Sequence, residues 1–272
     1  AGRQGPGCCI RLWSPAEQQR RPAFSRPELQ LADPQPVVLE LAIWGAGLGE
    51  ELPWLEPPPR ASLLEGQQQL IALGALTSDG RLSPAGRLLG QLGTHPRLGV
   101  LMLESHRRGC PGLGCDLAAL LSERDPLRLR DRGCDLLARL EALKRERRLA
   151  PLRQLSQQLR RQLAGLKLDP PCDQQDHDVA RLILTAFPDW LALQRHGQPG
   201  RYRLRQGRGA DLVPHDPLTG SEALAVARVD LGGRETRIQL AVAISDATLQ
   251  TLAAQEGQWL DSVHWDAAAA RI

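Results

Sequence analysis

The chain has 272 residues, and 42% of them are hydrophobic, which is enough for more than one domain with a buried core. Its formal net charge of +3 is too small to require a nucleic-acid partner. No segment approaches the roughly 18 uninterrupted apolar residues of a membrane span, and the first residues lack the basic-then-apolar order of a secretory signal. We therefore expect a cytoplasmic protein that does not enter a membrane.

The first 36 residues predict little regular structure. Residues 9–13 have the pattern of a short apolar strand, and a lone strand needs partners from elsewhere. The absence of an initiator methionine also suggests a truncated start. Residues 14–36 carry five prolines and predict a connector.

Residues 37–96 predict a winged helix. Apolar residues at helical spacing predict one helix over 37–44 and another over 63–73. The segments on either side of the 78–80 turn can pair as a hairpin. Ser83 then caps a third helix, with a proline at its first position.

A long helical region follows. Four segments carry spaced apolar positions and predict an antiparallel bundle with short breaks. These segments are residues 98–108, 115–123, 136–149 and 152–166. A fifth helix is predicted over 178–194, where Pro188 should kink or divide it.

From Tyr202 onward the apolar period changes to two, which predicts strands. The expected strands are residues 202–205, 224–229 and 236–242, with Gly207-Arg208-Gly209 among the turns that link them. They indicate a small OB-like β-barrel, followed by a short helix over 246–255 and a last strand over 259–265. The predicted fold class is multidomain α+β: a winged helix, then a helical bundle, then a small β-barrel.

No self-sufficient catalytic motif is present. The sequence has no G-x-x-x-x-G-K-[ST] phosphate loop, no adjacent Asp-Glu pair for Mg²⁺, no G-x-S-x-G and no H-E-x-x-H. The six cysteines include no C-x-x-C pair, which favours a reducing cytoplasm. His106, Cys110 and Cys115 are candidate metal ligands, but zinc needs a fourth ligand and tighter spacing, so we expect no metal. Asp176-His177-Asp178 predicts a polar helix start rather than a catalytic cluster.

Residues 1–13, AGRQGPGCCIRLW, resemble a stretch of the DEAH-box ATP-dependent RNA helicases. In that family a Q-R-x-G-R-x-G-R motif ends the second RecA-like domain, and G-P-G-x-C-x-R-L-[YW] follows. This chain keeps only the final A-G-R of the first motif. The resemblance implies that Arg3 is the arginine finger, which faces the γ-phosphate of ATP. A planar guanidinium suits the charge that spreads over phosphate oxygens.

Two further matches extend the resemblance over nearly the whole chain. The winged helix of these enzymes and the start of their helicase-associated bundle are similar to residues 54–59, 73–76, 79–87 and 95–98. The HrpB branch of the family is indicated by residues 115–125, 181–182, 186–189, 202–204 and 207–210. Trp265-Asp266 resembles the start of that branch's extra C-terminal region.

The resemblance implies a division of the chain into seven parts. They are the end of the second RecA-like domain (1–13), a connector (14–36), the winged helix (37–96), the helicase-associated helical bundle (97–168), a helical connector (169–198), the OB-like β domain (199–256) and the start of the C-terminal region (257–272). The missing RecA-like motor domains are expected in the same polypeptide and are the expected partners of these parts.

Residues 124–167 contain thirteen basic and five acidic residues, a local charge of +8. A basic helical stretch can follow phosphates by releasing counterions, and the alternative is a solvated face of Arg-rich helices. In the barrel, basic residues surround an aromatic side chain, an arrangement that holds single strands. The candidate nucleic-acid residues are Lys144, Arg145, Arg147, Arg148, Arg201, Tyr202, Arg203, Arg205 and Arg208.

By resemblance, the chain is the accessory region of an ATP-dependent RNA helicase, whose parent couples ATP hydrolysis to RNA translocation and unwinding. ATP and Mg²⁺ would be cofactors of the intact parent, and the partner would be single-stranded RNA without sequence preference. The chain alone would bind no cofactor and hydrolyse no ATP. Two alternatives remain open: a winged-helix DNA-binding regulator, and a protein-interaction module that binds no nucleic acid.

Overall fold

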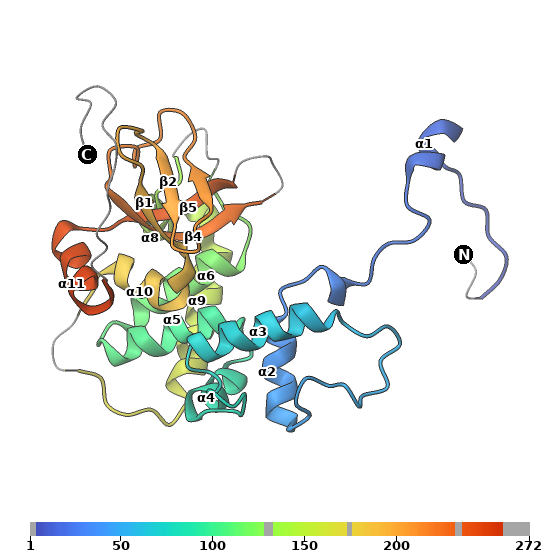
Figure 1. Ribbon diagram of the computed structural model, residues 1–272, viewed down its shortest axis with the longest axis horizontal. Helices are drawn as coiled ribbons and strands as arrows, with labels where there is room; N and C mark the ends of the chain where they lie inside the picture. The colour runs from blue at the N-terminus through green and yellow to red at the C-terminus, as the bar shows by residue number, and fades with distance from the viewer. Residues whose placement is uncertain (1–3, 128–132, 173–175, 232–235, 258–272) are drawn as a thin grey trace, which may run out of the picture.

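The computed structural model describes residues 4–127, 133–172, 176–231 and 236–257. Figure 1 shows an N-terminal arm that runs away from the rest of the molecule, a central group of helices, and a β-barrel above them with α11 at its flank. In the described part of the chain, no helix is long and apolar enough to cross a membrane.

The N-terminal arm carries α1 (Pro15–Arg20) and the 3-10 helix η1 (Glu28–Gln30), neither of which has a buried residue. The Ser14 side chain caps α1, and the Arg21 guanidinium lies 4.2 Å from the centre of the Trp13 ring. The strand predicted over residues 9–13 does not form. A lone strand has no neighbouring strand to hydrogen-bond its backbone N–H and C=O groups. Water satisfies these groups equally well in an irregular chain, so the extended strand gains no stability.

Three helices and one hairpin form the next part of the fold: α2 (Gln35–Trp44), α3 (Arg60–Ala72) and α4 (Pro84–Leu92). Leu76 and Leu82 pair in an antiparallel bridge between α3 and α4. The Ser83 hydroxyl accepts a hydrogen bond from the Gly86 N–H at 2.9 Å. The predicted helices, hairpin and cap are therefore confirmed, while their assignment as a winged helix stays a prediction.

The hairpin and α4 pack closely because residue 86 is glycine. A Cβ atom at Gly86 would lie 2.2 Å from the carbonyl oxygen of Ala75, which no real side chain tolerates. Around this contact, Val38 of α2, Leu70 of α3 and Leu89 of α4 share a small hydrophobic core.

Helices α5 (Pro96–Arg107), α6 (Pro111–Ser122), α8 (Leu136–Arg145) and α9 (Ala150–Ala164) form the helical body. All four correspond to predicted helices, but the prediction over 136–149 was too long. The helix ends at Arg145, Glu146 is extended, and the 3-10 helix η2 (Arg147–Leu149) follows. The Arg153 guanidinium stabilises this break, because it donates to the carbonyls of Leu143 and Glu146 at 2.7 and 2.9 Å.

The segment predicted as one helix over 178–194 divides into α10 (Val179–Ala186), the 3-10 helix η3 (Pro188–Trp190) and strand β1 (Leu191–Gln194). Pro188 ends the helix, as predicted, because it lacks an N–H and restricts the residue before it. The helical prediction for 191–194 was wrong. Ala192 pairs there with Leu204 on one side and Leu224 on the other, a non-local pairing that local propensity does not reveal.

Five strands close the barrel in the order β1-β2-β3-β5-β4. The other four are β2 (Arg201–Leu204), β3 (Gly209–Asp211), β4 (Ala223–Asp230) and β5 (Thr236–Ala243). β3 and β5 pair in parallel, and the other neighbours pair antiparallel. The barrel was predicted, but β3 was missed because Gly207-Arg208-Gly209 has turn character and three residues are too short to show alternation. The strand predicted over 259–265 lies outside the described residues.

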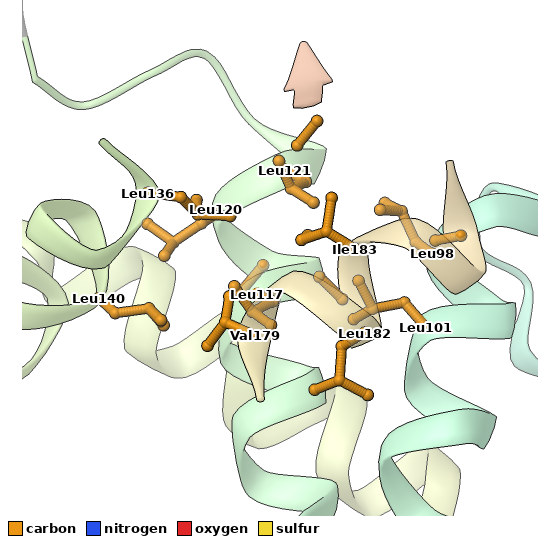
Figure 2. Close-up of a cluster of buried hydrophobic side chains, with 14 of the residues drawn as sticks. Leu98, Leu101, Leu117, Leu120, Leu121, Leu136, Leu140, Val179, Leu182 and Ile183 are labelled. Atoms are coloured by element: carbon orange, nitrogen blue, oxygen red, sulfur yellow. The ribbon is translucent and has the colours of Figure 1, made fainter. Parts of the chain in front are cut away.

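Helix α10 lies between the helical body and the barrel, and one hydrophobic core includes all three. Figure 2 shows Leu182 and Ile183 of α10 among side chains of α5 and α6, including Leu101 and Leu117. On the barrel side, the core contains small side chains of β4, which let the helix approach the sheet closely. These are Ala223, Ala225 and Ala227.

Helix α11 (Asp246–Glu256) confirms the helix predicted over 246–255 and is attached to the start of α10. The Thr248 hydroxyl donates to Asp178 Oδ2 at 2.6 Å. The other oxygen of the same carboxylate, Oδ1, accepts from the N–H groups of Ala180 and Arg181. One side chain thus caps α10 and holds α11.

Three of the six free cysteines are buried and three are exposed. Burial raises the pKa of the Cys115 thiol to about 12. Burial also raises the pKa values of Cys110 and Cys134, and the nearby carboxylates of Asp176 and Asp216 add to the effect. These three thiols therefore stay protonated near neutral pH.

We expect Leu182→Ala to lower the free energy of unfolding by about 2–5 kcal/mol, because it opens a cavity at a fully buried position. The matched control is Leu137→Ala on α8, whose residue is 44% exposed and whose loss should change stability by about 0.5 kcal/mol or less. Urea denaturation followed by circular dichroism measures both. Equal losses in the two variants would contradict the central position of α10.

Thiol alkylation of the folded chain at pH 8 should modify the exposed Cys8, Cys9 and Cys172 and leave the buried three unmodified until the chain unfolds. The reacting species is the thiolate, and a raised pKa lowers the thiolate fraction at pH 8, so it slows the reaction. Mass spectrometry of digested protein measures each site. Modification of Cys115 at the rate of Cys172 would contradict this assignment.

Candidate nucleic-acid interface

The predicted basic cluster lies at the C-terminal end of α8 and in η2, and all four side chains are exposed. Arg145 and Arg148 are each ion-paired with a nearby glutamate, at 3.0 and 2.6 Å. Lys144 and Arg147 have no ion-pair partner within the described ranges. Among the described residues, only two of the four cations, Lys144 and Arg147, are therefore unpaired and available to an anion.

Several other arginines of this stretch stabilise the fold instead of charging the surface. Arg139 is 1% exposed and pairs with Asp125 at 2.9 Å. Arg153 caps the end of α8. Arg160 pairs with Asp116 at 2.9 Å. The local charge of +8 thus overstates the positive surface of the helical body.

Strand β2 places its arginines outside the barrel and its tyrosine inside. Arg201 and Arg203 are exposed, whereas Tyr202 is fully buried. The Tyr202 hydroxyl lies 2.8 Å from the carbonyl oxygen of Ser221 and 3.1 Å from that of Leu218, and burial raises its pKa. The prediction that Tyr202 stacks on a base is therefore wrong, because its ring has no exposed face.

The structure does not gather the predicted barrel arginines on one surface. Arg201 lines a pocket of about 360 Å³, Arg205 a cleft of about 480 Å³ beside α10 and α11, and Arg208 a cleft of about 600 Å³. Arg201, Arg205 and Arg208 therefore line three different hollows.

The largest of these hollows, which we call the central cleft, has walls from three parts of the fold. Its lining includes residues from α3, from the start of α5, from the end of α6 and from the barrel. Its polar, charged and aromatic members are Asp33, Glu65, Gln69, His95, Arg97, Ser122, Phe187, Asp189, Trp190, Gln206, Arg208 and Arg228. A ligand in this cleft would contact elements that are far apart in the sequence.

Two further arginines line the central cleft but are held by hydrogen bonds. Arg97 is buried, donates to the carbonyl of Ala186 at 2.9 Å and pairs with Asp189 at 3.2 Å. Arg228 donates to the carbonyls of Leu121 and Glu123, both at 2.9 Å. Among the described lining residues, Arg208 is the arginine without an ion-pair partner or carbonyl acceptor.

One acidic group of the central cleft, Asp33, is held by local hydrogen bonds. Asp33 Oδ2 lies 3.2 Å from His95 Nε2. Burial opposes ionisation of Asp33, but the hydrogen bonds from His95 and from the Gln35 N–H outweigh it and lower the Asp33 pKa. The carboxylate is thus ionised at neutral pH, and its oxygens are already hydrogen-bonded to His95 and to the Gln35 N–H.

Arg97, Trp190 and Arg228 were not among the predicted site residues. Arg97 stands in the His-Pro-Arg-Leu motif that supports the resemblance, yet the motif alone assigns it no contact. Its ring neighbours are Phe187 and Trp190, at 5.3 and 5.8 Å from the guanidinium carbon. Only the tertiary structure brings these residues to one cleft.

Arg3, the predicted arginine finger, lies outside the described residues. Among the residues that the structure describes, no three His, Cys, Asp or Glu side chains converge to hold a metal ion. Two of the candidate metal ligands contact backbone carbonyls instead. His106 Nε2 lies 3.0 Å from the carbonyl oxygen of Asp169, and the Cys110 thiol donates to the carbonyl oxygen of Asp176.

No family model matches the chain. The ATP-dependent RNA helicase HrpB of Escherichia coli K12 is 31% identical over 270 residues, which are 98% of this chain and 31% of that protein. The ATP-dependent RNA helicase HrpA of the same organism is 35% identical over 46% of this chain and 10% of its own length. The probable ATP-dependent RNA helicase DHX35 of Homo sapiens is 31% identical over 44% of this chain and 17% of its own length.

Two solved structures share the fold over most of the chain. The crystal structure of the E. coli DExH-box NTPase HrpB has a TM-score of 0.74 at 31% identity and covers 99% of this chain and 32% of its own. A crystal structure of the E. coli DEAH/RHA helicase HrpB has a TM-score of 0.71 at 28% identity, with 94% and 30% covered.

The match to HrpB is not confined to one motif, because sequence and fold agree from one end of this chain to the other. The chain spans about a third of the length of that relative, and less of the other two. The predicted resemblance is thereby confirmed. The chain is a homologue of E. coli HrpB, a DEAH-box ATP-dependent RNA helicase, over nearly its whole length.

Proposed function

We propose that this chain is the accessory, nucleic-acid-channel region of an ATP-dependent RNA helicase. The observation that carries the proposal is the 31% identity to HrpB across 98% of the chain. The chain corresponds to only 31% of HrpB, and the proposal therefore assigns the helicase reaction to a longer parent protein. In that parent, ATP hydrolysis by RecA-like domains would be coupled to movement along RNA and to unwinding.

Single-stranded RNA is the ligand that the central cleft suits best. A strand needs a cation for its phosphates, and polar or aromatic side chains for its unstacked bases. Arg208 supplies the cation, and Gln206 and Trp190 lie in the same lining. These contacts select no particular base, which supports binding without sequence preference.

The rigid walls of the central cleft favour this role. Arg97 and Arg228 tie the ends of α10 and α6 to other elements, so the cleft is shaped before RNA arrives. A preformed cleft loses less conformational entropy when it binds a strand. The exposed Lys144 and Arg147 at the end of α8 would add a weaker contact with phosphates outside the cleft.

ATP and Mg²⁺ are assigned by this proposal to the parent's motor domains. Arg3 is the residue proposed to reach the γ-phosphate, and it lies outside the described residues. The role we derive for the described residues is therefore contact with RNA.

We expect the purified 272-residue chain to hydrolyse no ATP, with or without RNA, because the sequence lacks a phosphate loop. Release of inorganic phosphate measures this, and a complete HrpB-type helicase is the positive control. ATP turnover that stays with the chain through a final purification step would refute the assignment of ATP chemistry to other domains.

We expect Arg208→Ala to weaken single-stranded RNA binding and to reduce the slope of log affinity against log salt by about one, since one phosphate contact is lost. Fluorescence anisotropy of a labelled oligouridine at several salt concentrations measures both quantities. The control is Arg21→Ala, which removes an exposed arginine of the N-terminal arm that pairs with Glu17.

Other outcomes of this titration would favour other functions. An unchanged slope in Arg208→Ala would exclude the central cleft as the RNA path. A palindromic DNA duplex bound much more tightly than RNA would indicate a DNA-binding regulator. Absence of any nucleic-acid binding at low salt would indicate a protein-interaction module.

A further inference from the structure

A separate hollow at one end of the barrel, the barrel-end pocket, is not used by the proposed RNA path. Its volume is about 360 Å³, and it shares no lining residue with the central cleft. It is lined by the start of β2, the end of β3, the start of β5 and the loop that follows β3. The lining residues that carry charge or a polar side chain are Arg201, Asp211, His215, Thr219, Thr236 and Arg237.

Strand register places two arginines on either side of one carboxylate. Arg201 of β2 pairs with Asp211 of β3, and Asp211 pairs in turn with Arg237 of β5. Both arginines are exposed, and within the described ranges neither guanidinium has an ion-pair partner. Two arginines without an ion-pair partner in the described part of the chain therefore line a single pocket.

The pocket also contains a buried hydroxyl that lacks a partner. Thr236 is 1% exposed, and its Oγ1 has no hydrogen-bond partner among the described residues. Buried polar atoms are almost always hydrogen-bonded, and the exceptions call for an explanation. A ligand oxygen in the pocket would satisfy this hydroxyl.

The pocket wall includes a residue in an uncommon backbone conformation. His215 has a φ of 62°, in the left-handed region that favours glycine. The neighbouring Asp216 holds this loop, because its carboxylate accepts from the N–H groups of Cys134 and Leu218 at 2.8 and 3.0 Å. Such strain is common where a side chain is held toward a ligand.

We propose that the barrel-end pocket binds a phosphate group. Phosphate oxygens accept several hydrogen bonds at once, and arginine forks supply them with matching geometry. Arg201 and Arg237 provide the charge, the Thr236 hydroxyl donates one further bond, and His215 adds a donor at the wall. The carboxylate of Asp211 between them reduces the net charge of the pocket but leaves it positive.

The phosphate could belong to a free ion, to a mononucleotide or to the end of an RNA strand, and the recognising chemistry is the same. Because no residue is shared with the central cleft, this proposal does not depend on the RNA path described above. Variants of the two sites can therefore fail separately.

The test is calorimetric titration of the full 272-residue chain with inorganic phosphate and with adenosine 5′-monophosphate. Arg201→Ala and Arg237→Ala should each weaken phosphate binding by about tenfold, since each removes a charge-assisted contact. Arg203→Ala is the matched control: it removes an exposed arginine from the same strand that does not line the pocket, and affinity should not change.

Two more variants separate binding from a structural role. Thr236→Val keeps the shape of the side chain and deletes the unpartnered hydroxyl, so it should weaken phosphate binding while thermal stability stays equal or rises. Asp211→Asn should strengthen phosphate binding, because it removes the negative charge between the arginines. Weaker phosphate binding in Asp211→Asn would overturn the proposal, as would a stability loss in Thr236→Val without a loss of affinity.

The source of the phosphate is decided by comparing oligonucleotides. If RNA with a 5′-phosphate binds more tightly than RNA with a 5′-hydroxyl, and Arg237→Ala abolishes the difference, the ligand is an RNA end. If inorganic phosphate and the mononucleotide bind but the two RNAs do not differ, the ligand is a small molecule. No saturable binding of either small ligand, together with equal binding of the two RNAs, would overturn the proposal.

Discussion

The whole structure depends on the burial of α10 between the helical body and the barrel. This helix has only eight residues, too few to be stable alone, so tertiary contacts hold it in place. Leu182 and Ile183 are fully buried, and its core continues into β4 through three alanines. If α10 were removed, the helical body and the barrel would each expose an apolar face. The central cleft lies where these two parts meet.

Arginines complete this arrangement at the ends of helices. The last carbonyls of a helix have no partner within the helix and carry partial negative charge. Arg97 bonds to the end of α10, Arg228 to the end of α6, and Arg153 to the end of α8. Each donor comes from another part of the chain. A guanidinium suits this task because its several N–H groups can reach two carbonyls at once.

Local signals in the sequence predicted the elements well. The Ser83 cap, the hairpin around residues 78–80 and the alternating strands all form, and the resemblance to the HrpB helicases is confirmed. What local signals could not supply is pairing between distant segments. The residues of strand β1 were predicted to be helical, because the pairing with β2 and β4 that makes them a strand is not visible in the local sequence.

The candidate site was only partly accessible from the sequence. A charge count treats every arginine alike, yet Arg139 is buried in an ion pair while Arg208 lines the central cleft. The basic neighbours of Tyr202 predicted that its ring stacks on a base. Side chains alternate between the two faces of β2, however, and this alternation places Tyr202 in the interior of the barrel. The orphan hydroxyl of Thr236 has no signature in sequence, since it is defined by the partners that it lacks.

The double role of Asp178 restricts which residues the chain can accept at the start of α10. Helix caps are ordinarily interchangeable among aspartate, asparagine, serine and threonine. Here one carboxylate oxygen caps the helix while the second accepts the Thr248 hydroxyl of α11. Serine and threonine offer a single oxygen, and the second group of asparagine is a donor. A homologue that keeps the bond in its present direction, from the hydroxyl at 248 to residue 178, must therefore keep an acid there, so aspartate at 178 and a hydroxyl at 248 should change together during evolution.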